Sequence, residues 1–338
     1  MIRFRLLFIS IALFFLFSCS SDPVNVNTVT GGITAREMGK TLSHEHVLVD
    51  FIGADSTGYQ RWNKEEVVKK VLPYFKEIHD IGYKTFVDCT PACLGRDPEL
   101  LKILSERSGV QILTNTGYYS AVDGKYVPEF AKTETAEQIA ARWIDEAQNG
   151  IEGTGIYPGF IKISVEPDQL SELNRKIVEA ACITHRETGL SIMSHTGPAV
   201  PAFQELEILK KYKVHPSAFI WTHANNEKDR NKLLEAAKMG AFISFDNFTP
   251  AVTTEYVDFA LFMKKNGQLP RVLFSHDAGW YSPGETDGGD FRGFTDIENY
   301  LIPALEKAGI SQFDLFQLFY GNPADAFQIR KRLSDDKQ

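Results

Sequence analysis

The apolar and polar positions of this chain repeat in one order: an amphipathic segment of helical period, a glycine, then a short β-branched run. "PYFKEIHDIG" precedes "YKTFVDCTP", and "NRKIVEAACITHRETG" precedes "LSIMSHTG". The glycines stand where a helix commonly ends in the left-handed conformation. Strands that alternate with helices in this way predict a parallel sheet.

Eight short strands follow from this pattern, and they begin near Leu42, Thr85, Gln111, Phe160, Ser191, Phe219, Ala241 and Val272. Eight such units over roughly 280 residues predict an α/β fold of the (β/α)₈ barrel type. An open, doubly wound sheet is the alternative. Such sheets usually begin with a Gly-rich turn that binds a nucleotide, and no such turn follows the first strand here. Because no composition break interrupts the pattern, residues 31–330 are predicted to form one domain, followed by a polar tail at 331–338.

The first 30 residues have a different character. Two arginines precede an apolar run from Leu6 to Phe17, which is short for a membrane span and typical of a signal peptide over residues 1–18. The run ends in "LFSC", which resembles a bacterial lipobox and predicts lipidation of Cys19. We therefore expect a tether over residues 19–30 and a lipid-anchored protein at a bacterial membrane, facing the periplasm or the cell exterior. A plain signal peptide cut near Ser20 is the alternative.

Composition narrows the expected partners. The chain has 338 residues, 43% of them hydrophobic, and a net charge of −8, which suits a soluble domain with a large core. No Lys/Arg-rich run offers a footprint for phosphates, so we expect no nucleic acid. The expected partner is a small-molecule substrate, the membrane is reached through the lipid anchor only, and a homodimer stays open. Three further cysteines, Cys89, Cys93 and Cys182, are interpreted as thiols rather than a disulfide framework.

Candidate chemistry lies at the predicted strand ends. In "LSHEHVLVD", His44 and His46 are two residues apart on a strand and therefore point to the same face. The carboxyl ends of barrel strands meet at one face, so later strand ends should bring further groups to them. Four imidazoles and a carboxylate suit zinc or a similar divalent ion, and five such groups exceed the needs of one tetrahedral ion with an open position. We therefore predict two ions, held by His44, His46, Lys162, His195, His223 and Asp277.

Lys162 is the unusual member of this set. An ammonium group among divalent cations would be repelled, and its burial is costly. A lysine at this place is understandable if its amine reacts with carbon dioxide. The product, N6-carboxylysine, is an anion with two oxygens, one for each metal ion.

The combined motif resembles the amidohydrolase superfamily and, within it, the phosphotriesterase family. "LSHEHVLVD", "DCTPACLGRDPELLKILSERSGVQILTNTGYY" and "GNPADAF" are similar to the family's sequences, over residues 31–330. The resemblance implies that His44, His46 and Asp277 hold the more buried ion, that His195 and His223 hold the outer one, and that carboxylated Lys162 bridges them. It also implies that a bridging hydroxide attacks the substrate while Asp277 takes its proton.

The chain departs from two well-known branches of that family. Where its phosphotriesterases have an Asp and a His that act as a proton shuttle, this chain has Asn226 and Asn247, and an arginine typical of its lactonases is missing. Amides suit hydroxyl groups, aromatic rings can stack on a substrate, and an arginine can meet a carboxylate or phosphate. The substrate-binding residues predicted on this basis are Asn115, Tyr118, Asn226, Asn247, Trp280 and Arg292. The asparagines also suit turns and caps, and Arg292 suits a surface salt bridge.

These observations predict a metal-dependent hydrolase that acts on a lactone or carboxyl ester of a hydroxylated small molecule. Phosphotriesterase activity is one alternative. An inactive solute-binding surface lipoprotein is another, and a deaminase or nuclease is disfavoured by the lysine and by the lack of a basic strip. The remaining histidines are interpreted as bystanders, and Glu45, which points away from its neighbours, as a structural partner.

Overall fold

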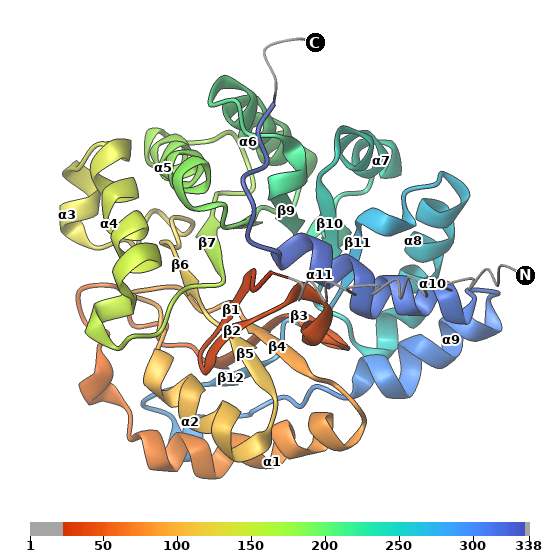
Figure 1. Ribbon diagram of the computed structural model, residues 1–338, viewed down its shortest axis with the longest axis horizontal. Coiled ribbons are helices and arrows are strands. Elements are labelled where there is room, and N and C mark those ends of the chain that lie inside the picture. The colour runs from red at the N-terminus through yellow and green to blue at the C-terminus, as the bar shows by residue number, and fades with distance from the viewer. Residues whose placement is uncertain (1–22, 335–338) are drawn as a thin grey trace, which may run out of the picture.

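The predicted barrel is confirmed. The computed structural model describes residues 23–334, which form a closed ring of parallel strands surrounded by helices (Figure 1). The third and eighth strands are each split into two pieces. Around the barrel the strands are β3 (Thr41–Leu48), β4 (Thr85–Asp88), β5 and β6 (Gln111–Leu113, Asn115–Thr116), β7 (Phe160–Ser164), β8 (Ile192–His195), β9 (Phe219–Thr222), β10 (Phe242–Phe245), and β11 and β12 (Val272–Phe274, Gly279–Tyr281).

The helices cover the outside of the ring. The expected glycines follow three of them in the left-handed conformation, Gly109 after α2, Gly189 after α5 and Gly240 after α7. The helices are α1 (Lys64–Asp80), α2 (Pro98–Ser108), α3 (Glu129–Thr133), α4 (Ala136–Asn149), α5 (Glu172–Thr188), α6 (Ala199–Lys211), α7 (Arg230–Met239), α8 (Thr253–Lys265), α9 (Ile302–Lys307), α10 (Gln312–Phe316) and α11 (Asn322–Phe327).

The seam between the last and first strands closes the barrel and builds the site. The Asp277 amide donates a hydrogen bond to the His44 carbonyl (3.0 Å), and the His46 amide donates one to the Ala278 carbonyl (2.9 Å). Gly279 pairs with His46 at a φ of 103°, where a Cβ atom would lie 1.8 Å from the His46 carbonyl oxygen. Only glycine permits this approach. The close seam places Asp277 beside both histidines.

An apolar layer fills the barrel below the site. One fully buried side chain comes from each of seven strands, and period-two alternation puts polar groups on the same inner face two residues later. Phe160 lies below Lys162, and Met193 lies below His195. These side chains fill the interior of the barrel beneath the polar groups. A substrate can therefore reach the polar groups only from the carboxyl ends of the strands. The layer consists of Val87, Leu113, Phe160, Met193, Ile220, Phe242 and Leu273.

Two predicted boundaries need correction. The tether was expected to reach residue 30, but β1 (Val26–Thr28) pairs with β2 (Gly31–Ile33), and Val26 is fully buried in the cluster that closes the base of the barrel. The predicted polar tail also begins too early, because Arg332 is buried and its amide donates to His185 Nε2 (3.0 Å). The signal peptide and Cys19 lie outside the described residues. Within residues 23–334, no helix combines the length and apolar character that a membrane span needs.

Candidate metal centre and active site

The structure brings the six predicted metal-binding side chains together at the carboxyl ends of the strands. All of them line one cavity of about 150 Å³. Asp277 lies closest to the histidines of β3, with its Oδ1 3.0 Å from His46 Nε2 and 3.6 Å from His44 Nε2. The rings of His195 and His223 lie side by side, 4.1 Å between centroids. His44, His46 and Asp277 therefore form one compact group of possible ligands, and His195 and His223 form a neighbouring pair.

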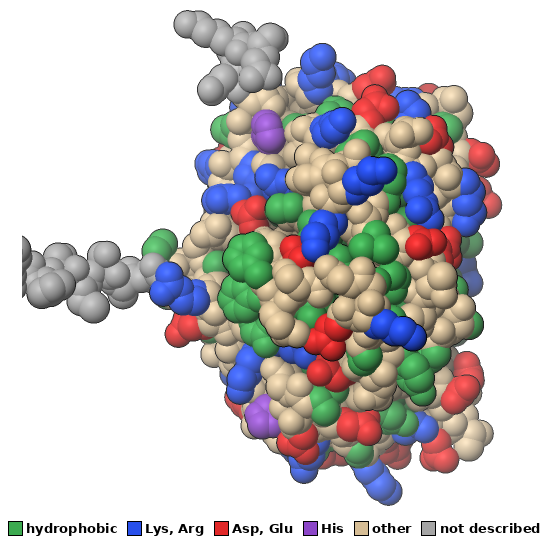
Figure 2. Space-filling view, turned by 90° about the vertical axis from the view of Figure 1, so that its right-hand side faces the viewer, with side chains coloured by type: hydrophobic (Ala, Val, Ile, Leu, Met, Phe, Trp, Pro, Cys, Tyr) green, Lys and Arg blue, Asp and Glu red, His purple; other side chains and the backbone are tan. Residues whose placement is uncertain are grey.

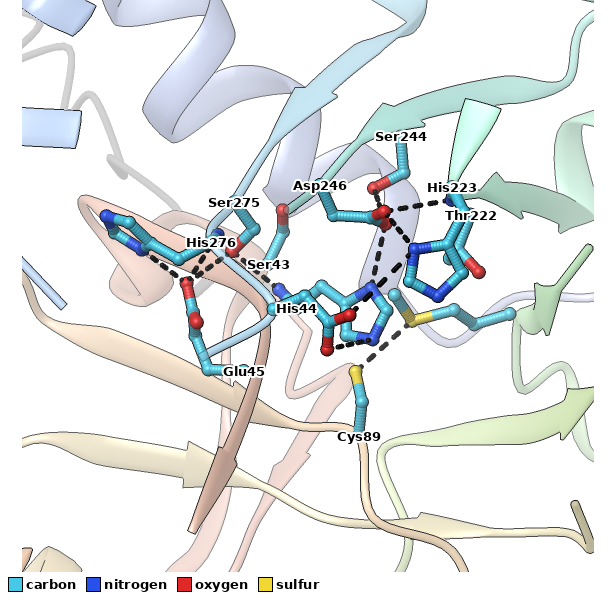
Figure 3. A network of polar contacts seen from close by, with 12 residues as sticks. Ser43, His44, Glu45, Cys89, Thr222, His223, Ser244, Asp246, Ser275 and His276 are labelled. Carbon is cyan, nitrogen blue, oxygen red and sulfur yellow. Dashed lines mark hydrogen bonds and ion pairs between the residues drawn. The ribbon is translucent and has the colours of Figure 1, made fainter. Parts of the chain in front are cut away.

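Asp246, which follows β10, orients two of these imidazoles (Figure 3). Its Oδ2 is 2.8 Å from His44 Nδ1, and its Oδ1 is 2.6 Å from His223 Nδ1. Burial raises the pKa of this carboxyl, but His223 and His44 outweigh burial and hold it well below its ordinary value. Because Asp246 engages the Nδ1 atoms, it leaves both Nε2 atoms for a metal ion, as carboxylates behind zinc-binding histidines do.

Two of the four imidazoles, His44 and His195, have lowered pKa values, whereas burial of His223 is outweighed by Asp246, which raises the pKa of that imidazole. Thr90 contacts His46 Nδ1 at 2.8 Å, so its Nε2 also stays available. Burial, together with the charge of Lys162, lowers the pKa of His44 to about 4. Burial and the neighbouring His223 also lower the pKa of His195 well below its ordinary value. Imidazoles that are neutral near pH 7 are the form that binds a metal ion.

Lys162 fits the predicted carbamate. Its side chain is almost fully buried on β7, and its Nζ atom has no hydrogen-bond partner among residues 23–334. An unpaired buried ammonium group is costly, because no partner replaces the water that it loses. An N6-carboxylated lysine would remove that positive charge and offer anionic oxygens to two ions. The donor set therefore fits a pair of divalent ions.

Glu45 and His276 clamp the loop that carries Asp277, on the far side of β3 from the cavity (Figure 3). Glu45 Oε1 accepts hydrogen bonds from Ser275 Oγ (2.7 Å) and the His276 amide (3.0 Å), and Oε2 accepts one from the Ala278 amide (3.0 Å). Both residues are fully buried. They face away from the site, as predicted, and hold the backbone of Asp277 from behind.

Glu205 on α6 plays a similar part behind His195. It is fully buried and accepts hydrogen bonds from Ser194 Oγ (2.5 Å) and Thr196 Oγ1 (2.7 Å), the two neighbours of His195. Burial raises the pKa of Glu205 to about 8. The turn after β8 is thereby fixed to α6.

Backbone strain is concentrated at the strand ends. His223, Asn247, Asp277 and Trp280 all have positive φ values, between 51° and 72°. Such values are rare outside glycine and persist only where the surroundings enforce them. The Asp246 contacts to His223 and the Glu45 contacts beside Asp277 supply that enforcement.

The wall of the cavity is apolar and aromatic rather than amide-rich. Trp280 belongs to it, as predicted, is 40% exposed, and packs edge-on against His46. Tyr119 packs against His195 with 5.1 Å between ring centroids. Cys89 also faces the cavity, but burial raises the pKa of its thiol well above the ordinary value, which disfavours a nucleophilic role. The remaining wall residues are Val49, Phe51, Leu94, Val122 and Tyr126.

Two of the predicted substrate residues are structural. Asn115 is fully buried, and its Nδ2 donates to the carbonyls of Asp88 (3.1 Å) and Thr90 (3.0 Å), which fixes the loop after β4. Tyr118 points away from the cavity and packs against Trp143 in the hydrophobic core. The residue that reaches the cavity is the next one, Tyr119. The split of the third strand at Thr114 makes this side-chain direction hard to read from the sequence.

The other three predicted residues also lie outside the cavity lining. Asn226 and Asn247 are exposed at the ends of β9 and β10. Arg292 donates to the carbonyls of Phe248 and His276 and lies 3.4 Å from Asp296. Its guanidinium group therefore ties two loops together, and the predicted contact with a substrate anion is not supported.

Known proteins of similar sequence and structure identify the family of this chain. The model of the phosphotriesterase family matches residues 24–327. The chain belongs to this family. Among its relatives, the phosphotriesterase homology protein of Escherichia coli is 26% identical, over 86% of this chain and 98% of that protein. The aryldialkylphosphatase of Saccharolobus solfataricus is 24% identical, over 87% and 96%.

A solved structure of the same phosphotriesterase family shows the same fold. It is a mutant PTE-like lactonase from Deinococcus radiodurans, 27% identical with a TM-score of 0.80, over 89% of this chain and 99% of that one. Family, fold and site together identify this protein as a metal-dependent hydrolase that acts on ester-type bonds. The predicted family is confirmed.

Proposed function

We propose that this phosphotriesterase-family protein hydrolyses lactones or other carboxyl esters that carry an apolar group. The observation that supports this is the cavity itself, an apolar and aromatic wall above a cluster of histidines, a lysine and an aspartate. A hydroxylated substrate is no longer expected, because the asparagines predicted to bind its hydroxyl groups, Asn115, Asn226 and Asn247, lie outside the cavity lining. A lactone with an apolar substituent would place its carbonyl at the polar base and its substituent against Trp280 and Tyr119.

The site would use two divalent ions, zinc in the first instance, held by the six residues named above. Such ions polarise an ester carbonyl and make water a nucleophile at neutral pH. Carbon dioxide would supply the bridging group: the neutral Lys162 amine forms a bond to its carbon and releases one proton. Asp246 and Thr90 hold the imidazoles in the orientation that this arrangement needs.

Asp277 is the group that can move the proton. Burial raises its pKa, but His44 and His46 outweigh burial and hold it well below its ordinary value, so the group is an ionised carboxylate. It would take the proton of the attacking water and return it to the leaving alkoxide. Asn226 and Asn247, in contrast, have side-chain amides that neither accept nor release a proton near neutral pH. One carboxylate suffices for a lactone, because the leaving oxygen stays tethered beside it.

Phosphotriester hydrolysis is the second candidate, because the same apolar wall would also receive an aryl group. The deciding experiment compares kcat/KM for a lactone with an apolar side chain and for an aryl phosphotriester on one metal-loaded preparation. We expect the lactone to be preferred and Asp277→Asn to abolish both activities. A preference of about tenfold or more for the phosphotriester, over 1 kcal/mol in transition-state binding, would contradict the lactone proposal while leaving the metal site intact.

The proposal includes a location. Lipidation of Cys19, inferred from "LFSC", would anchor the protein to a bacterial membrane, facing the periplasm or the cell exterior. Cys19→Ala should then move the protein from the membrane fraction to the soluble fraction. A wild-type protein that is already soluble would contradict this part of the proposal alone.

A further inference from the structure

The base of the barrel is the part of the fold nearest to the proposed lipid anchor, and the following inference rests on that anchor. Val26 is fixed in β1 at the base, and the described chain starts at residue 23, four residues after Cys19. Four fully extended residues span at most about 14 Å. A lipidated Cys19 would therefore hold residue 23 within that distance of the membrane, close to the base of the barrel, which faces the viewer in Figure 1.

Basic side chains gather at this base. The ends of α6 and α7 contribute Lys210 and Lys238, and the chain segment 330–334 crosses just after α6, where Leu333 pairs with Val214. The crossing is fixed by main-chain hydrogen bonds, from the Ser334 amide to the Lys213 carbonyl (3.0 Å) and from the Arg330 amide to the Gly189 carbonyl (3.1 Å). We call the resulting exposed group the basal basic cluster: Lys210, Lys213, Lys238, Arg330 and Lys331.

The cluster places five exposed Lys and Arg side chains at the base, although the whole chain carries a net charge of −8. Lys and Arg side chains are visible along the left-hand edge of Figure 2, the edge that corresponds to the front of Figure 1. Cations at helix ends also stabilise the helix dipole, which explains part of the pattern. Acidic side chains occur on this face too, among them Glu37, Asp80 and Glu187, and Asp325 forms an ion pair with Arg330 of the cluster. None of these acidic residues belongs to the strip formed by residues 330–334.

Apolar side chains lie exposed among the cluster. Val24 is 66% exposed next to the tether, Leu333 is 45% exposed within the crossing segment, and Met239 is 41% exposed at the end of α7. Isolated apolar residues between lysines and arginines are typical of surfaces that rest in the headgroup region of a bilayer. A lipid bilayer surface fits all three observations: the short tether, the positive charge of the cluster and the exposed apolar side chains.

We propose that the base of the barrel docks on anionic phospholipid through the basal basic cluster, with Val24, Met239 and Leu333 inserted among the headgroups. The cavity opens at the opposite end of the barrel. Docking would therefore hold the active site away from the bilayer and toward the aqueous compartment. Its substrate reaches it from solution rather than from the membrane.

Lysine reactivity measures this orientation directly. The lipidated full-length protein is reconstituted in vesicles with about 30% phosphatidylglycerol and treated with an amine-reactive reagent, and labelling is read by mass spectrometry. Labelling is compared residue by residue with soluble Cys19→Ala protein. We expect protection of Lys210, Lys213, Lys238 and Lys331. Lys125 and Lys228, on loops at the cavity end, are the internal controls and should stay equally reactive.

Unprotected basal lysines, or protected Lys125 and Lys228, would overturn the docked orientation. A wild-type protein that does not sediment with vesicles would overturn both the anchor and the docking, while the hydrolase proposal would stand because it is measured separately. A second measurement uses Cys19→Ala protein that also carries Lys210→Glu and Lys331→Glu. It should bind these vesicles at least about tenfold more weakly than Cys19→Ala alone, whereas Lys125→Glu with Lys228→Glu should bind unchanged. Equal binding of the two charge variants would contradict the role of the cluster.

Discussion

Replacing Asp246 by asparagine would test whether the buried carboxylate organises the metal site. The native carboxylate serves His44 Nδ1 at 2.8 Å and His223 Nδ1 at 2.6 Å, one imidazole on each oxygen. Asparagine keeps the size but has only one oxygen, so one imidazole loses its acceptor and faces an N–H donor. A hydrogen bond to a charged group contributes about 1.5–3 kcal/mol. A loss of that size corresponds to metal affinity that is weaker by about 10- to 100-fold, the range typical of partners behind metal-binding histidines.

The assay is competition for the metal between the protein and a chelator of known affinity, with circular dichroism to confirm folding. Ser244→Ala is the matched control, because it removes only the hydroxyl that donates to Asp246 Oδ2 (3.0 Å) and leaves both imidazole contacts in place. We expect the control to change the affinity by less than about threefold. A folded Asp246→Asn protein with the affinity of the wild type would refute the orienting role.

Three further predictions concern groups around the site. Because burial raises the pKa of Glu205 from 4.5 to about 8, the folded protein binds a proton there that the unfolded chain releases, so stability should fall as pH rises through that window. Glu205→Gln should remove this loss, up to about 4–5 kcal/mol, in urea unfolding measured from pH 5 to pH 9. Glu45→Gln leaves one of its buried donors unpaired and should lower the melting temperature and the metal occupancy together; a change in neither would contradict the clamp. Trp280→Ala should raise KM for lactones with apolar side chains several-fold, but hardly for an unsubstituted lactone, in steady-state assays.

The sequence was sufficient for the barrel and for the six clustered side chains, because both depend on periodicity. Strand ends at regular spacing identify a common face, and His44 and His46 share it by alternation alone. Asp246 is not among the predicted residues, although it follows a strand in "AFISFDN", the same kind of position as His195 and His223. It contacts the predicted metal-binding histidines rather than a metal ion or a substrate, and no spacing rule reveals that role.

The loops could not be predicted in the same way, because side-chain direction there depends on irregular backbone. The break at Thr114 turns Tyr118 into the core and Tyr119 into the cavity. Arg292 satisfies carbonyls on neighbouring loops, and these contacts exist only once the barrel has closed. The sequence does not reveal β1, which lies within the predicted tether, because a strand of three residues is too short for a periodic signal.

Elemental analysis of the purified protein, after loading with zinc and bicarbonate, measures how many metal ions the site holds. We expect two ions per chain in the wild type. We expect fewer in Lys162→Ala, with partial recovery of metal when a small carboxylate is added, because that anion can replace the missing carbamate oxygens. One ion or none in the fully loaded wild type, or two ions in Lys162→Ala without added carboxylate, would contradict a pair of ions bridged by carboxylated Lys162.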